Sequence, residues 1–256
     1  VRTLCEWLTR RHYLDSNPWD DVPQRPDAPA MPTLRALSAT QWRLVQDWLT
    51  EAAAGRESAA LQRLRFLLKL AYTSGMRLAE LAHARVEWFR HEPLDDGRWV
   101  WSIMVFGKRA KWREVPLPDS TVESFREYLA CRGLPDDIFA NPPPTPLIAR
   151  LDGGGPLSTA RIHEVLTSAF ADCAAWAETR DPRAAARIRQ ATTHWLRHTY
   201  GSHAAAAGVP QDILQANLGH RSPATTSIYL QAEKSRKHRA VAAAFDGTTP
   251  GSRAGS

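Results

Sequence analysis

The sequence predicts an α+β protein that is mainly α-helical and carries one small antiparallel β-sheet or hairpin. Helices are indicated by apolar residues that recur every three or four positions, as at Trp42 and Val45. The hairpin is indicated by two segments, 99–106 and 112–117, which are rich in β-branched and aromatic residues. A short break that contains Gly107 separates these two segments.

The predicted elements divide the chain into four parts. Residues 1–14 are predicted to be a helix, and residues 15–35 a stiff linker, because five prolines fall between positions 15 and 32. Residues 36–246 are predicted to form the main domain, and residues 247–256 a disordered tail. Because the chain begins inside a helical pattern, we expect residues 1–14 to be the last helix of a truncated preceding domain.

Helix-start signals place the helices of the main domain. Ser38 and Gln41 have the spacing of a capping box, and Ser158 precedes another helical pattern. Gly75 is expected to end one helix just before the next begins. The helices are predicted to follow Ser38 and to span 57–72, 78–84, 119–131, 158–178, 181–190, 193–207 and 211–218.

Composition indicates a soluble, basic protein of the cytoplasm. No apolar run approaches the roughly twenty residues that a membrane-spanning helix needs. Lys and Arg number 33 against 27 Asp and Glu, and the net charge of +6 favours a polyanionic partner. Cys5, Cys131 and Cys173 are odd in number and far apart, which argues against a disulfide framework and against a cysteine-type zinc site.

Two clusters of charged residues lie between positions 77 and 113. Arg77 and Glu80 are three residues apart, so the carboxylate can hold the guanidinium in place, although an ordinary surface ion pair would have the same spacing. The second cluster lies at the turn of the predicted hairpin, which is either a solvated tip or a basic tip that enters a DNA groove. Its cations are Lys108, Arg109, Lys111 and Arg113.

The segment from 193 to 229 concentrates the residues that suit phosphate chemistry. His194 and Arg197 share one face of a predicted helix, His220 follows a short helix that Gly219 ends, and Tyr229 falls in a last helix. Arginine binds phosphate oxygens, histidine moves protons, and tyrosine can form a covalent intermediate. Taken singly, each residue has an ordinary structural interpretation, and only their combination favours a catalytic site.

These motifs together resemble the tyrosine recombinase, or phage integrase, family over roughly residues 38–240. SGMRLAEL is similar to the first arginine box of that family, GKRAKWREVPL to its lysine hairpin, HWLRHT to its His-x-x-Arg pair and LGHRSPATTSIYL to its nucleophile box. The resemblance implies the family's catalytic fold and a preceding core-binding domain, of which residues 1–14 would be the last helix. It implies the catalytic set Arg77, Lys108, His194, Arg197, His220 and Tyr229, with Glu80 in support.

The resemblance also implies an activity and its partners. Tyr229 would cut DNA through a 3′-phosphotyrosine intermediate, with no cofactor and no metal, in a homotetramer on synapsed double-stranded DNA at the nucleoid. Two alternatives of related chemistry are a type IB topoisomerase and an inactive DNA-binding module. A zinc hydrolase using His194 and His198 lacks the glutamate that its motif requires, because Trp195 stands there. The expected DNA-contacting cations are Arg109, Lys111, Arg113 and Arg221.

Overall fold

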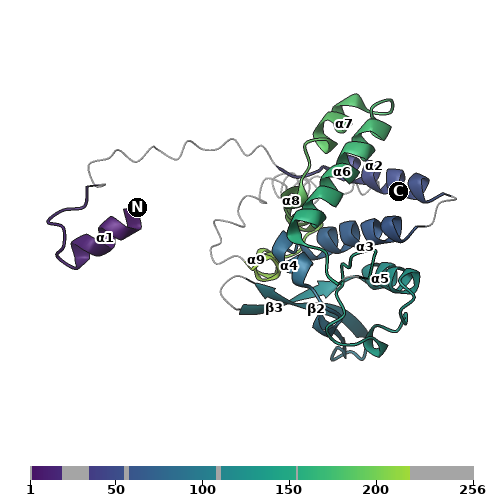
Figure 1. Ribbon diagram of the computed structural model, residues 1–256, viewed down its shortest axis with the longest axis horizontal. Helices are drawn as coiled ribbons and strands as arrows, with labels where there is room; N and C mark the ends of the chain where they lie inside the picture. Colours follow the sequence, from purple (N-terminus) through teal and green to yellow (C-terminus); the bar gives the residue numbers. More distant parts are fainter. Residues whose placement is uncertain (1, 19–34, 55–57, 108–110, 154, 220–256) are drawn as a thin grey trace, which may run out of the picture. The chain divides into compact units, whose positions relative to one another are not determined.

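The computed structural model describes residues 2–18, 35–54, 58–107, 111–153 and 155–219, in two compact units, 1–33 and 34–256 (Figure 1). The first unit contains helix α1 (Arg2–Arg10) and, just after it, Tyr13, which stacks on Trp7 with ring centroids 6.2 Å apart. Most of the predicted linker, the predicted helix around Tyr229 and the predicted tail lie outside the described residues.

The second unit is mainly helical, as the sequence predicts. Helix α2 begins at the predicted capping box, in which the side chains and backbones of Ser38 and Gln41 hydrogen-bond reciprocally. None of the helices in the described ranges is long and apolar enough to cross a membrane. The helices are α2 (Ala39–Ala53), α3 (Ala59–Ser74), α4 (Leu78–His83), α5 (Asp119–Cys131), α6 (Thr159–Ala177), α7 (Pro182–Ile188), α8 (Thr193–Ala206) and α9 (Gln211–Leu218), with short 3-10 turns at Val86–Trp88 and Ile138–Ala140.

The sheet has three antiparallel strands in the order β1-β2-β3. Strands β2 (Trp99–Gly107) and β3 (Lys111–Leu117) form the predicted hairpin, with Gly107 paired to Lys111 at the end where the two strands are connected. Strand β1 (Phe89–Pro93) was not predicted, because Phe89 is its one buried residue and the sequence shows no alternation there. It is therefore a strand by virtue of its pairing with β2.

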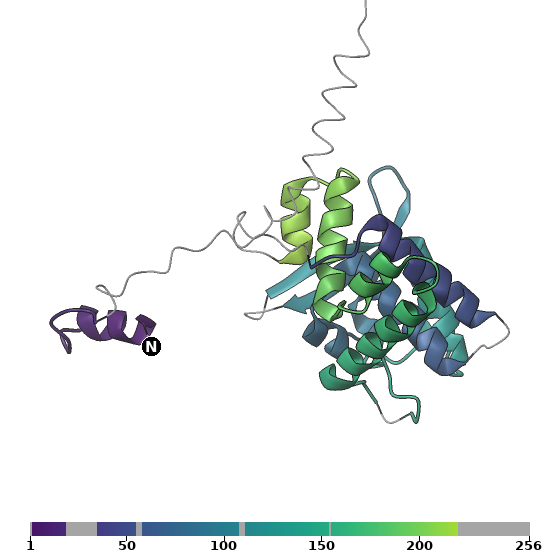
Figure 2. The same cartoon turned by 90° about the horizontal axis from the view of Figure 1, so that it is seen from above.

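Helix α3 forms the centre of the core and leads into the region of the predicted site. Phe66 on α3 stacks on Phe125 of α5 with ring centroids 4.7 Å apart, and Leu67 and Leu70 are fully buried. Helix α3 also packs on α8, and α9 packs on both α8 and β3. In Figure 2 α8 and α9 lie side by side next to the hairpin. The C-terminal ends of α3 and α9, the start of α4 and strand β3 therefore meet in one place.

Candidate active site

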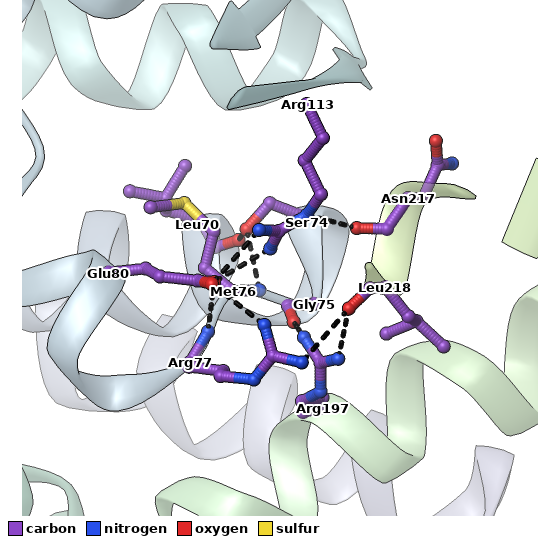
Figure 3. A network of polar contacts seen from close by, with 10 residues as sticks. All are labelled: Leu70, Ser74, Gly75, Met76, Arg77, Glu80, Arg113, Arg197, Asn217 and Leu218. Carbon is purple, nitrogen blue, oxygen red and sulfur yellow. Dashed lines mark hydrogen bonds and ion pairs between the residues drawn. The ribbon is translucent and has the colours of Figure 1, made fainter. Parts of the chain in front are cut away.

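Three arginines from different elements point toward one region between α3, α4, α8, α9 and β3 (Figure 3). Arg77 is the N-cap residue of α4, Arg197 lies on the buried face of α8, and Arg113 lies in β3. The Arg197 residue is buried, whereas the Arg77 side chain keeps 37% of its surface exposed. Within the cluster, the Arg77 guanidinium is therefore accessible to solvent, whereas the Arg197 guanidinium is largely enclosed.

The turn at Gly75 places the carbonyl that anchors Arg197. Gly75 has the left-handed conformation (φ +60°) that ends α3, and Arg197 Nη1 donates to its carbonyl oxygen at 2.5 Å. A Cβ atom at Gly75 would lie 2.6 Å from Tyr200 Cδ1, so α8 can approach this closely because the residue is glycine. The break that the sequence predicts at Gly75 is therefore also a contact between α3 and α8.

Glu80 is the anion that organises the cluster. Its carboxylate accepts hydrogen bonds from the Arg77 backbone N–H (2.8 Å) and Arg77 Nη1 (2.9 Å), and from Arg113 Nη1 (2.9 Å) and Nη2 (2.7 Å). Burial alone would raise the pKa of Glu80, but the hydrogen bonds and charges of Arg113 and Arg77 outweigh it and lower that pKa. Glu80 binds Arg77 within a larger ion-pair network than the spacing of the two residues indicated.

Arg113 does not lie at an exposed basic tip, where the sequence predicts either a solvated cation or a DNA contact. Its side chain is only 11% exposed, and it forms a two-pronged ion pair with Glu80 and donates through Nε to the Asn217 carbonyl at 2.7 Å. Three of the N–H donors of Arg113 are thus engaged within the protein. Lys111, by contrast, is exposed at the start of β3.

The carboxyl end of α9 receives all three arginines. Arg113 binds the Asn217 carbonyl, while Arg197 Nη2 and Arg77 Nη2 both donate to the Leu218 carbonyl, the latter at 3.4 Å. The last carbonyls of a helix carry partial negative charge and have no partner within the helix, so cations suit them. Arg77 and Arg197 thus point at one oxygen, in the manner that would suit an oxygen of a phosphate.

A cavity of about 400 Å³ opens beside this pair and is lined by His194 together with Arg77, Arg197 and His163. Burial and the nearby cations, Arg197 first, lower the pKa of His194, and burial lowers the pKa of His198 to about 4. The Nε2 atoms of His194 and His198 lie 2.8 Å apart, so one ring donates and the other accepts. Both imidazoles are therefore neutral near pH 7.

The model of the phage integrase family matches residues 45–236 of this sequence. The chain belongs to the phage integrase family. The tyrosine recombinase XerC of Neisseria meningitidis serogroup B (strain ATCC BAA-335 / MC58) is 28% identical over 238 residues, which cover 91% of this chain and 66% of XerC. The tyrosine recombinase XerD of Caulobacter vibrioides (strain ATCC 19089 / CIP 103742 / CB 15) is 28% identical over 184 residues, which cover 71% of this chain and 53% of XerD.

Solved structures of a recombinase and an integrase share the fold. XerH recombinase in a post-cleavage complex with palindromic difH substrate matches 86% of this chain and 55% of its own, with a TM-score of 0.62 and 22% identity. The Tn1549 transposon integrase in complex with circular intermediate DNA matches 93% of this chain and 77% of its own, with a TM-score of 0.55 and 16% identity. The α+β fold with its small antiparallel sheet is therefore the tyrosine recombinase catalytic fold, as predicted.

In this phage integrase fold, the described residues of the predicted catalytic set converge. Arg77, Arg197 and His194 line one cavity, and Glu80 binds Arg77. Sequence analysis missed the inward role of Arg113, although alternation along β3 places it on the same face as the buried Val115 and Leu117. The predicted residues Lys108, Arg109, His220, Arg221 and Tyr229 lie outside the described residues.

Among the residues that the structure describes, three or more His, Cys, Asp or Glu side chains nowhere gather in a group that could hold a metal ion. The charge available at the cavity is instead that of the Arg77 and Arg197 guanidinium groups. These groups can stabilise negative charge on oxygen without a proton transfer of their own, because arginine stays protonated at any physiological pH.

Proposed function

We propose that this chain is the catalytic part of a site-specific recombinase that cuts and rejoins double-stranded DNA through a 3′-phosphotyrosine on Tyr229. The observation that carries the proposal is the convergence of Arg77 and Arg197 on one oxygen beside His194. The family match and the DNA-bound XerH and Tn1549 integrase structures support the same activity and partner. The match spans 66% of the length of XerC, so the activity and partners of a whole recombinase are part of this proposal.

In the cleavage step, the Tyr229 oxygen attacks the scissile phosphorus, and the bond from phosphorus to the 5′-oxygen breaks. The 3′-phosphate is then attached to the tyrosine, and the other strand end leaves as a 5′-hydroxyl. Arg77 and Arg197 bind the non-bridging oxygens, where negative charge grows in the five-coordinate state, and His220 adds a hydrogen bond. The reverse attack by a 5′-hydroxyl reseals DNA without a nucleotide cofactor, since the phosphotyrosine keeps the bond energy.

Two protons move in this step. The neutral imidazole of His194 accepts the phenol proton of Tyr229, and its lowered pKa keeps it ready to accept near pH 7. Lys108 donates a proton to the leaving 5′-oxygen. General acid and base groups of this kind each contribute about 10²–10⁴-fold to the rate.

The remaining cations bind the DNA backbone, and a homotetramer brings two DNA sites together. Exposed Lys111, together with Arg109 and Arg221, neutralises phosphates without reading sequence. Arg113 does not belong with these DNA contacts, because it is held by Glu80 and by α9. A homotetramer on two synapsed DNA sites would carry out strand exchange, in the cytoplasm at the nucleoid.

The test is covalent trapping on nicked DNA. The 256-residue chain is incubated with a pool of nicked genomic fragments of its source, and adducts that survive SDS are recovered and sequenced. We expect one enriched site for the wild-type chain and no adduct for Tyr229→Phe, which should still bind that site. A Tyr13→Phe variant, which alters an exposed tyrosine outside the nucleophile box, serves as the control and should retain the adduct. An adduct that persists in Tyr229→Phe would contradict the proposal.

A further inference from the structure

Arg113 lies between two glycines that each directly precede a residue of the proposed catalytic set. Gly107 is followed in the sequence by Lys108, and Gly219 is followed by His220. These two glycines are 112 positions apart in the sequence, and they end different elements, β2 and α9. Arg113 is the side chain that both of them approach.

The approach is close on both sides. A Cβ atom at Gly107 would lie 3.0 Å from Arg113 Nη1 and 3.4 Å from Glu80 Oε1. A Cβ atom at Gly219 would lie 3.3 Å from Arg113 Cδ and 3.6 Å from its Nε, and Gly219 is also in the left-handed conformation (φ +61°). Both backbones therefore rest against the Arg113 side chain, in positions that a larger residue would disturb.

Hydrogen bonds fix the orientation of the Arg113 side chain. The two-pronged pair with Glu80 uses Nη1 and Nη2, and the bond to the Asn217 carbonyl uses Nε. A planar guanidinium with three of its donor atoms engaged cannot rotate without breaking at least one bond. Glu80 in turn binds the Arg77 backbone and side chain, so Arg113 connects the hairpin, α9 and the arginine pair.

We propose that Arg113 is a positioning residue that sets the spacing between the backbone leading to Lys108 and the backbone leading to His220. This inference rests on the proposed recombinase function. The hairpin that carries the general acid and the helix end that carries the phosphate-binding histidine would then move together. A misplacement of about 1 Å in a catalytic group can cost about 10²-fold in rate, so a positioning side chain has a large kinetic effect.

The kinetic test uses Arg113→Lys, Arg113→Met and the control Arg98→Met. Arg98 is also an ion-paired arginine of the sheet region, with Asp96 at 2.7 Å, but it is exposed. Single-turnover cleavage is measured on the trapped DNA site with oxygen, and then with sulfur, in the 5′-bridging position. Sulfur leaves without a proton, so it bypasses the general acid.

We expect Arg113→Lys to cleave the oxygen substrate about 10²-fold more slowly than the wild type and to recover to within about 10-fold on sulfur. Arg98→Met should match the wild type on both. A folded Arg113→Lys that is slowed equally on both substrates would overturn the inference, because the general acid at Lys108 would then not depend on Arg113.

A second readout does not depend on cleavage. In the DNA-free chain, Arg113→Lys and Arg113→Met should accelerate amide hydrogen exchange at Gly219 and at the end of β2, whereas Arg98→Met should not. The Gly219 N–H is a suitable probe because it donates to the Ala216 carbonyl at 3.0 Å. Unchanged exchange at both places would overturn the inference. A wild-type chain that forms no adduct, with accelerated exchange in the Arg113 variants, would contradict the recombinase function while supporting the positioning role.

Discussion

Replacing Glu80 by Gln should destabilise the protein far more than the same change at an exposed ion pair. Glu80 is 5% exposed and accepts four hydrogen bonds, two of them from the 11%-exposed Arg113 side chain. Glutamine keeps the size but loses the charge, which leaves the Arg113 cation enclosed without its partner. Breaking one side of a buried ion pair costs about 3–5 kcal/mol of unfolding free energy. The part that Arg77 contributes is smaller, because its side chain is 37% exposed and screened by water.

The matched control is Glu164→Gln. Arg161 and Glu164 are also an arginine and a glutamate three residues apart on a helix, 2.5 Å apart, but both are more than half exposed. Exposed pairs contribute about 0–1 kcal/mol, so this control should change the unfolding free energy by less than about 1 kcal/mol. Urea denaturation monitored by circular dichroism measures both variants. Equal losses for Glu80→Gln and Glu164→Gln would refute the role of Glu80 as the organising anion.

The pH dependence gives a second check on the same residue. The folded pKa of Glu80 lies below its ordinary value of 4.5, so the unfolded chain takes up this proton at a higher pH than the folded chain does. The stabilisation is therefore complete above about pH 4.5 and is lost as the pH falls through the folded pKa. The difference in unfolding free energy between wild type and Glu80→Gln should shrink on acidification. A difference that stays constant down to pH 3 would show that charge on Glu80 is not responsible.

Three further predictions concern other parts of the site. Gly75→Ala should cost more than about 2 kcal/mol in unfolding free energy, because its Cβ would lie 2.6 Å from Tyr200 Cδ1. The control Gly133→Ala has a similar φ of +69° but no atom within 4 Å of the added Cβ, and it should cost about 1–2 kcal/mol. Equal losses in the two variants would contradict the close packing at Gly75. The pKa of His198 is about 4 in the folded chain and near 6.5 in the unfolded chain, so the unfolded chain binds this proton at a higher pH. The unfolding free energy should therefore rise as the pH increases from about 4 to 6.5, and it should rise less in His198→Gln. An NMR titration of His198 near 6.5 in the folded protein would contradict this. Covalent cleavage should survive excess EDTA, and its loss with recovery on Mg²⁺ alone would contradict the arginine-based mechanism.

Local sequence signals predict most of the fold, because helix caps and short-range periodicity are properties of neighbouring residues. The Ser38–Gln41 capping box and the end of α3 at Gly75 both occur where the sequence predicts them. Strand β1 was missed because its pairing with β2 is a property of the sheet and not of residues 89–93 themselves. Prediction from sequence therefore succeeded where one segment determines its own structure.

The site was predictable in part for the same reason. The Arg77–Glu80 pair is local and was expected, whereas the ion pair between Arg113 and Glu80 joins residues 33 positions apart. No local sequence pattern around Arg113 predicts Glu80 or the Asn217 carbonyl as its partners. The contact with Asn217 exists because β3 packs against α9. The inward position of Arg113 is therefore visible only in three dimensions, and the sequence analysis placed this residue among the DNA-contacting cations instead.

The central claim is that Tyr229 becomes joined to DNA at the site built by Arg77, Arg197 and His194. Tryptic digestion of the trapped complex, followed by mass spectrometry of the peptide that retains nucleotide, tests it directly. Cleavage after Arg221 and Lys234 gives the peptide 222–234, in which Tyr229 is the single tyrosine. We expect the nucleotide mass on this peptide and its absence in Tyr229→Phe. Nucleotide on a peptide that carries Tyr13, Tyr72, Tyr128 or Tyr200 would contradict the account.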